Sequence, residues 1–139
     1  MIVDASVAVR WYAVDDWTPA ARSLLDAAEP LIAPDFFVAE VANVLWKLAR
    51  ADAVADAQAE LALRELPQVV ALESVAPLAP RAFVIARVLN HAVYDCLYLA
   101  LAELRGMPMI TLDKRLHART RNTSWAELTV LLGEGAVPT

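Results

Sequence analysis

Short apolar runs alternate with longer amphipathic segments along the chain, a pattern typical of strands that alternate with helices. Strands are predicted at residues 1–4, 31–33, 69–72 and 109–112, with a weaker strand or helix at 128–132. Helices are predicted at 6–12, 19–28 (with Thr18 as N-cap), 35–50, 54–66, 80–89, 93–104 and 114–119. Strands joined through helices form crossover connections. The sequence therefore predicts a three-layer α/β/α fold, with a mostly parallel sheet of four to five strands.

The segment 35–50 has two apolar faces. One is a stripe of Phe37, Val41, Val44, Leu45 and Leu48, and the other consists of Ala39, Ala42, Trp46 and Ala49. The narrow polar strip between them contains Glu40, which is therefore expected to line a groove between packed surfaces. The second face suits either packing within the chain or the binding of a partner, and the pattern leaves both open.

Asp95 lies in a segment, 93–104, that is apolar nearly all round and ends before Gly106. Such a helix is predicted to be buried. A buried carboxylate without a partner is costly or titrates to its neutral form. Asp95 therefore needs a metal ion, a cationic partner or the positive end of its own helix dipole.

Asp4 and Asp113 each follow a predicted strand. Ligands of open α/β sheets bind beyond the carboxyl ends of the strands, although either residue would also suit a helix N-cap or a turn. Carboxylates gathered there would repel one another, and a divalent cation would remove that conflict. Oxygen ligands favour Mg²⁺ or Mn²⁺ over zinc. His91 and His117 lack a second His or Cys at ligand spacing, so structural or surface roles are expected for them.

Composition limits the remaining possibilities. The chain has 139 residues, 59% of them hydrophobic, a net charge of −5 and one cysteine, Cys96, which is expected to be buried and inert. No linker or repeat divides it, so one domain over residues 1–139 is expected. Charged residues interrupt every apolar run before the roughly 20 residues of a membrane helix, and no signal peptide is evident, so a cytoplasmic protein is expected. The surplus apolar surface predicts an oligomer or a bound partner.

Four segments together resemble the PIN-domain ribonucleases, and specifically the VapC-type toxins of VapBC toxin–antitoxin pairs. They are IVDASV at 2–7, APDFFVAEV at 33–41, YDCLYLALA at 94–102 and ITLDKRL at 110–116. They occur in the order of the family and span nearly the whole chain. The resemblance implies a PIN-like fold and a Mg²⁺- or Mn²⁺-dependent endoribonuclease that hydrolyses RNA phosphodiester bonds with metal-activated water. It also implies a homodimer and a VapB-type antitoxin whose C-terminal segment covers the active site.

The same resemblance assigns residues. By the pattern of the family, the catalytic acids are Asp4, Glu40, Asp95 and Asp113. Asp4, Asp95 and Asp113 would bind the metal, and Ser6 and Thr111 would support the acids by hydrogen bonds. Leu116 stands where many relatives carry a further acid, which supports at least one metal ion rather than a full two-metal site.

The net negative charge speaks against an RNA substrate, because nucleic-acid-binding surfaces are usually basic. Basic residues nevertheless cluster after Asp113: Lys114, Arg115 and Arg119 are predicted to contact phosphates, although a solvated helix face fits equally. The four tryptophans, Trp11, Trp17, Trp46 and Trp125, could stack on bases, but large aromatic residues lie more often in a core or an interface.

Two alternative functions remain. One is a catalytically silent PIN-fold binding module, which the presence of all four acids disfavours. The other is a Mg²⁺-dependent phosphatase with Asp4 as nucleophile. That chemistry needs a second aspartate two residues on, where this chain has Ser6.

Overall fold

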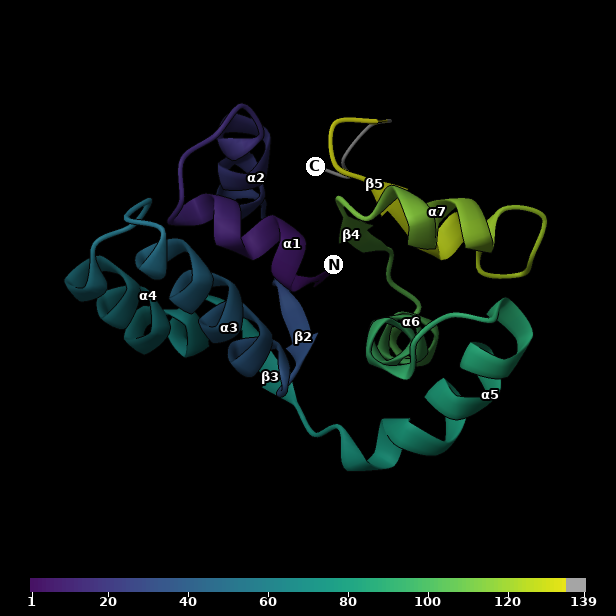
Figure 1. Cartoon of the computed structure of the whole chain (residues 1–139). Coiled ribbons are helices and arrows are strands. Elements are labelled where there is room, and N and C mark those ends of the chain that lie inside the picture. Colours follow the sequence, from purple (N-terminus) through teal and green to yellow (C-terminus); the bar gives the residue numbers. More distant parts are fainter. Residues whose placement is uncertain (135–139) are drawn as a thin grey trace.

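The computed structural model describes residues 1–134, and its centre is a parallel sheet of five strands (Figure 1). The strands are β1 (Ile2–Val3), β2 (Ile32–Pro34), β3 (Ala71–Glu73), β4 (Met109–Thr111) and β5 (Thr129–Leu131). Their order is β3-β2-β1-β4-β5, and all neighbours are parallel. The chain moves outward from β1 to β3 on one side and from β4 to β5 on the other. A topological switch point therefore lies between β1 and β4.

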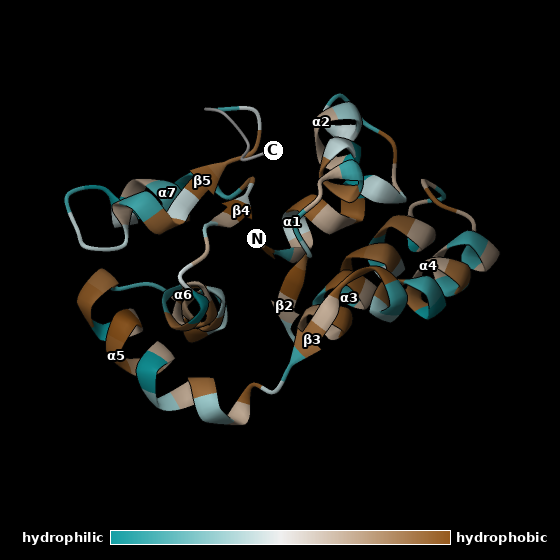
Figure 2. Ribbon diagram, turned by 180° about the vertical axis from the view of Figure 1, so that it is seen from behind, coloured by the Kyte–Doolittle hydropathy of each residue, from teal (hydrophilic) through white to brown (hydrophobic). Residues whose placement is uncertain are grey.

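Helices connect the strands and cover both faces of the sheet. They are α1 (Ala5–Ala8), α2 (Thr18–Ser23), α3 (Phe37–Arg50), α4 (Asp56–Val69), α5 (Ala79–Leu89), α6 (Val93–Arg105) and α7 (Lys114–Thr120), with 3-10 turns at Val9–Trp11, Leu24–Asp26, Ala76–Leu78 and Ala126–Leu128. Right-handed crossovers that run in opposite directions along a sheet lie on opposite faces. Accordingly, α1 to α4 lie together on one side and α5 and α6 on the other, as the opposite views in Figures 1 and 2 show. The predicted three-layer α/β/α fold is confirmed.

Helix α6 is buried over most of its length, since every residue from 96 to 102 is at most 5% exposed. It packs between α5 and the central strands. Gly106 follows its last residue with a φ of +62°, a left-handed conformation that a residue without a Cβ adopts readily. The prediction of a buried helix that ends at Gly106 is therefore confirmed. No single helix within residues 1–134 is long and apolar enough to cross a membrane. Among the described helices, the pair Ala76–Leu89 and Val93–Arg105 reaches that length together, across a bend of 114°.

Two local predictions are wrong. Thr18 is not the N-cap of α2, because Trp17 takes that position and Thr18 Oγ1 instead accepts the N–H of Asp15 at 2.9 Å. The Thr18 hydroxyl is thus used by the turn that precedes α2 and not by the first turn of the helix. The helix predicted at 54–66 is α4 (Asp56–Val69), which extends three residues further. Pro67 lies in its last turn, where proline lacks only one backbone N–H donor. Strand β3 consequently begins at Ala71 rather than at residue 69.

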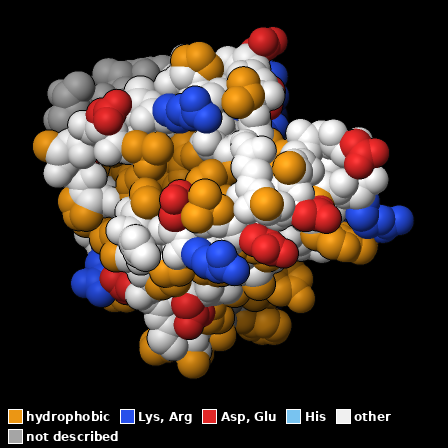
Figure 3. Space-filling view, turned by 90° about the vertical axis from the view of Figure 1, so that its left-hand side faces the viewer, with side chains coloured by type: hydrophobic (Ala, Val, Ile, Leu, Met, Phe, Trp, Pro, Cys, Tyr) orange, Lys and Arg blue, Asp and Glu red, His pale blue; other side chains and the backbone are white. Residues whose placement is uncertain are grey.

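The two faces of α3 differ in burial. Phe37, Val41 and Leu45, from the first face, are fully buried. Trp46, from the second face, is 53% exposed and lines a shallow groove of about 200 Å³ against α4. Of the two alternatives for the second face, packing within the core does not hold for Trp46. Figure 3 shows the side of the molecule that carries these helices, where hydrophobic side chains lie among charged ones.

Candidate active site

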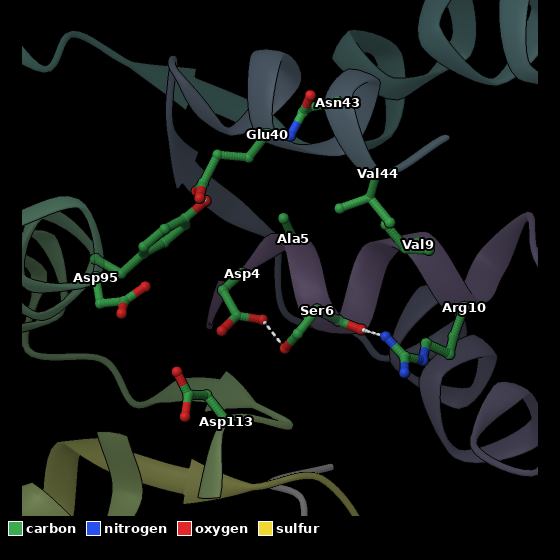
Figure 4. Close-up of a pocket in the computed structure, with 11 residues that line it drawn as sticks. Asp4, Ala5, Ser6, Val9, Arg10, Glu40, Asn43, Val44, Asp95 and Asp113 are labelled. Carbon is green, nitrogen blue, oxygen red and sulfur yellow. Dashed lines mark hydrogen bonds between the residues drawn. The ribbon is translucent and has the colours of Figure 1, made fainter. Parts of the chain in front are cut away.

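Four acidic side chains from four separate segments line one pocket beyond the carboxyl ends of β1 and β4 (Figure 4). Asp4 follows β1 and Asp113 follows β4, whereas Glu40 and Asp95 lie in the first turns of α3 and α6. The pocket has a volume of about 330 Å³. The fold therefore brings all four predicted acids together at the topological switch point, where open α/β sheets bind their ligands.

Asp4 is held by hydrogen bonds from three directions. It is the N-cap of α1 and only 6% exposed; its Oδ1 accepts the Val7 N–H at 3.3 Å and the Ser6 hydroxyl at 2.5 Å. Its Oδ2 accepts the hydroxyl of Thr111, the last residue of β4. Burial raises the pKa of Asp4 to about 6, although these hydrogen bonds favour the charged form, and the charge of Asp95 raises it further.

Glu40 is paired with a buried tyrosine on the opposite layer. Tyr98, which is 1% exposed on α6, donates its hydroxyl to Glu40 Oε1 at 2.6 Å. Burial raises the pKa of Glu40; the Tyr98 hydrogen bond opposes that rise, and the charge of Asp95 adds to it. Burial and the neighbouring Glu40 also raise the pKa of Tyr98, so its phenol stays protonated and remains a donor.

Asp95 lies between a histidine and Asp113. His91 Nε2 is 2.6 Å from Asp95 Oδ2, and the His91 side chain is 7% exposed. One ligand atom from each of His91, Asp95 and Asp113 lies within 4.8 Å of the other two. Asp113 is also the N-cap of α7, where its Oδ1 accepts the N–H of the buried Leu116 at 3.0 Å. Asp4 lies outside this group of three but lines the same pocket.

Three residues of the site were missed by sequence reasoning, and each is one helical turn from a predicted residue: Tyr98 follows Asp95 by three positions, Asn43 follows Glu40 by three and Arg10 follows Ser6 by four. His91, for which a structural or surface role was predicted, lies in the loop before α6 and contacts Asp95. Residues three or four apart share one face of a helix. Figure 4 shows Arg10 at the edge of the pocket away from the acids, where its Nη1 donates to the Ser6 carbonyl at 2.7 Å. The periodicity around each acid was the signal that could have identified them.

The basic residues after Asp113 have different surroundings. Lys114 and Arg115 are exposed. Arg119 instead donates Nη1 to the carbonyls of Leu89 at 3.0 Å and of Asn90, at the end of α5. Arg119 therefore has a structural role that the sequence did not indicate.

The other candidate residues divide by burial. Trp11 and Trp125 are buried and donate their indole N–H groups to the Ala21 carbonyl and to Glu103. Trp17 and Trp46 are exposed. Cys96 is buried, as predicted, and burial raises the pKa of its thiol to about 12, with a contribution from the charge of Asp95, so the thiol is unreactive near neutral pH.

The chain is similar to known proteins of one family. The family model described as PIN domain matches residues 1–122. Ribonuclease VapC3 from Pyrobaculum aerophilum is 34% identical over 119 residues, which cover 84% of this chain and 91% of the relative. Ribonuclease VapC3 from Mycobacterium tuberculosis is 36% identical over 118 residues, which cover 84% of each chain.

Two solved structures are similar in fold. The crystal structure of PAE2754 from Pyrobaculum aerophilum has a TM-score of 0.67 and 26% identity, and covers 88% of this chain and 85% of that chain. Mycobacterium tuberculosis VapC20, described as a sarcin-ricin loop cleaving toxin, has a TM-score of 0.66 and 21% identity, with 84% of this chain and 92% of that chain covered. At that identity, the likeness to VapC20 concerns the fold alone.

The raised pKa of Asp4 predicts a pH-dependent loss of stability in the metal-free protein. Between the ordinary value of 3.8 and about 6, the folded state holds a proton on Asp4 that the unfolded state has released. Stability therefore falls as pH rises through this window. Asp4→Asn removes the titration, so the unfolding free energy of the variant relative to wild type should rise between pH 4 and pH 7 by roughly 2–3 kcal/mol.

Urea unfolding at several pH values in EDTA measures this difference. Asp26→Asn, at an exposed aspartate on another part of the surface, is the control and should show no such trend. A constant difference between Asp4→Asn and wild type across pH 4–7 would contradict the raised pKa.

Proposed function

The chain belongs to the PIN-domain family, among the VapC-type endoribonuclease toxins, and from this premise we propose that its acidic pocket hydrolyses RNA with Mg²⁺, or Mn²⁺ in its place. The observation that carries the proposal is the convergence of Asp4, Glu40, Asp95 and Asp113 on one pocket whose lining includes a single cationic side chain, Arg10. Four carboxylates in one pocket repel one another and would repel a phosphodiester. A divalent cation would attract both the carboxylates and the phosphodiester, so that both can occupy the same site.

Asp95 and Asp113 would hold the metal, with Asp4 as the third carboxylate. The ligand atoms of Asp95 and Asp113 lie within 4.8 Å of each other and of His91, which fits a single ion. Carboxylate oxygens suit Mg²⁺ and Mn²⁺. When bound, such an ion lowers the pKa of a water molecule and screens the charge of the phosphate.

The remaining residues orient the acids and hold a proton. The hydroxyls of Ser6 and Thr111 fix the Asp4 carboxylate, and His91 fixes that of Asp95. Glu40 is outside the group of close ligand atoms, and its raised pKa makes it a stronger base than a free glutamate. We assign to Glu40 the role of proton acceptor, with Tyr98 holding one of its oxygens.

We propose two protein partners for two exposed apolar faces. The face of α5 that contains Phe83, Val84 and Val88, which are 55%, 41% and 63% exposed, would form a homodimer. The groove of Trp46 between α3 and α4 would bind the VapB-type antitoxin. Asn43 and Val44 of α3 line the acidic pocket while Trp46 of the same helix lines the groove, and we propose that one antitoxin segment reaches both.

We further propose that residues 1–139 form one domain that acts in the cytoplasm. The family model covers residues 1–122, and β5, at Thr129–Leu131, extends the same sheet beyond that match. The lone buried cysteine is consistent with a protein that needs no oxidising compartment.

The central prediction concerns cleavage by antitoxin-free protein. RNA should be cut in Mg²⁺ or Mn²⁺ and left intact in EDTA. Asp4→Asn, Asp95→Asn, Asp113→Asn and Glu40→Gln should each lower the rate by about 100-fold or more, because each removes a metal ligand or the proton acceptor. Asp26→Asn should cleave like wild type.

Thermal unfolding with and without Mn²⁺ gives a second readout, because a ligand that binds only the folded state stabilises it. Asp95→Asn and Asp113→Asn should lose this stabilisation, whereas Glu40→Gln should keep it. If partner-free wild type cuts no RNA in either metal, a catalytically silent binding module is the better description. Phosphate release from a phosphomonoester without RNA cleavage would instead support the phosphatase.

The basic residues after Asp113 generate a separate prediction. We propose that Lys114 and Arg115 contact phosphates next to the pocket, with Arg119 at the edge of the same surface. Arg115→Ala should weaken RNA binding several-fold at low salt and reduce the slope of log affinity against log salt by about 1. Arg119→Ala should in addition lower the unfolding free energy by about 1–3 kcal/mol, because two carbonyls at the end of α5 lose a charged donor. Unchanged RNA affinity in the Arg115→Ala, Arg119→Ala double variant would reject the phosphate contacts.

The two partner faces can be tested against each other. Val88→Glu places a charge on the α5 face and should convert a dimer to a monomer in light scattering, while antitoxin binding persists. Trp46→Glu should weaken antitoxin binding by at least about tenfold, the size of a typical hot-spot loss, and leave the dimer intact. If Trp46→Glu retains its antitoxin affinity, or Val88→Glu its dimer, the corresponding face is assigned wrongly.

A further inference from the structure

A second pocket adjoins the acidic pocket and shares Arg10 with it. It has a volume of about 200 Å³, and its walls are formed by Arg10, Trp17, Leu112, Lys114, Leu131 and Leu132. Leu112 and Lys114 flank Asp113 in the sequence, so this pocket, called here the Trp17 pocket, continues directly from the acidic pocket.

The indole of Trp17 is exposed and supported from behind. Trp17 is 40% exposed, and a Cβ added at Gly133 would lie 3.2 Å from its Cζ3 atom. The ring therefore rests against backbone that has no room for a larger residue without movement. Leu131 and Leu132, both buried, add an apolar wall. A supported indole with an open surface is the kind of platform on which nucleic-acid bases stack.

One aspartate fixes both Trp17 and Arg10. Asp15 Oδ1 accepts the backbone N–H of Trp17 at 2.9 Å, and Asp15 Oδ2 accepts Nε of Arg10 at 3.0 Å. Arg10 is further held by its 2.7 Å bond to the Ser6 carbonyl. Since a guanidinium has five N–H donors, Arg10 keeps donors for a phosphate while its position is set.

Two cations line the Trp17 pocket, in a chain whose net charge is −5. Arg10 is paired with Asp15, Lys114 carries a second positive charge, and Glu134 contributes a negative one. Within residues 1–134, Lys114 forms no ion pair. An aromatic ring and two cations in one pocket match a nucleotide, which has a planar base and an anionic phosphate.

We propose that the Trp17 pocket is a nucleotide subsite: it binds the RNA nucleotide adjacent to the scissile phosphate, with the base stacked on Trp17 and the neighbouring phosphate on Arg10 and Lys114. The proposal rests on the proposed ribonuclease function. It adds a path for the RNA strand as it leaves the acidic pocket. Arg10, shared by both pockets, is the point at which the strand passes from one to the other.

The test measures binding of a fluorescein-labelled single-stranded RNA by anisotropy in Mg²⁺. Asp95→Asn serves as the non-cleaving parent, since Asp95 does not line the Trp17 pocket. Trp17→Ala in this parent should weaken binding about tenfold, the size expected for the loss of one stacked base. Trp17→Phe should retain most of the affinity. Leu61→Ala, at an exposed apolar residue of α4 that lines neither pocket, is the control and should bind RNA like the parent.

Tryptophan fluorescence gives an independent readout. RNA should quench the emission of the parent and of Leu61→Ala, and should quench Trp17→Phe much less although Trp17→Phe still binds. Thermal unfolding checks each variant, because Trp17 precedes α2, and Trp17→Phe keeps the test valid if Trp17→Ala does not fold.

Three results would overturn the subsite. RNA affinity of Trp17→Ala equal to that of the parent overturns it while the ribonuclease function stands. Loss of antitoxin affinity with unchanged RNA affinity assigns the pocket to a peptide instead. Absence of both cleavage by wild type and RNA binding by the parent overturns the subsite together with the function on which it rests.

Discussion

The parallel direction of the strands is the constraint on which the site depends. In a parallel α/β fold each strand runs into a helix, so the N-termini of several helices lie at the carboxyl edge of the sheet. All four acids of the pocket lie at such helix starts: Asp4 and Asp113 cap α1 and α7, and Glu40 and Asp95 lie in the first turns of α3 and α6. The positive ends of these helices partly offset the gathered negative charge.

The same arrangement reconciles two roles for the aspartates. An aspartate after a strand can be an ordinary helix cap or a functional acid, and Asp4 and Asp113 are caps that also line the pocket. A cap uses part of the acceptor capacity of a carboxylate and fixes its direction. Capping therefore orients these carboxylates for a ligand at the edge of the sheet.

Hydrogen bonds between neighbouring elements hold the acids of the pocket in place although their charges repel one another. The hydrogen bond from Thr111 to Asp4 joins the ends of the central strands β4 and β1, and the bond from Tyr98 to Glu40 joins α6 to α3 across the sheet. Burial and mutual repulsion still raise the pKa values of Asp4 and Glu40. A divalent cation bound in this pocket would offset the repulsion between the acids. Arg10 and Lys114, in the Trp17 pocket beside it, are the cations that we propose for contact with the phosphates of an RNA strand in a chain of net charge −5.

The sequence by itself determined the layers, the strand-end positions of Asp4 and Asp113, and the burial of the helix that carries Asp95. These follow from local hydrophobic periodicity, which reports which face of each element is covered. Tertiary structure alone decided that Tyr98 meets Glu40, 58 residues away, that Arg119 binds the end of α5, and that Trp46 is exposed. Such facts depend on which surfaces of different elements meet, and periodicity within one element does not encode its neighbour. The Thr18 N-cap was wrong because Thr18 accepts a competing hydrogen bond from Asp15, and the helix predicted to end at residue 66 runs through Pro67 to Val69.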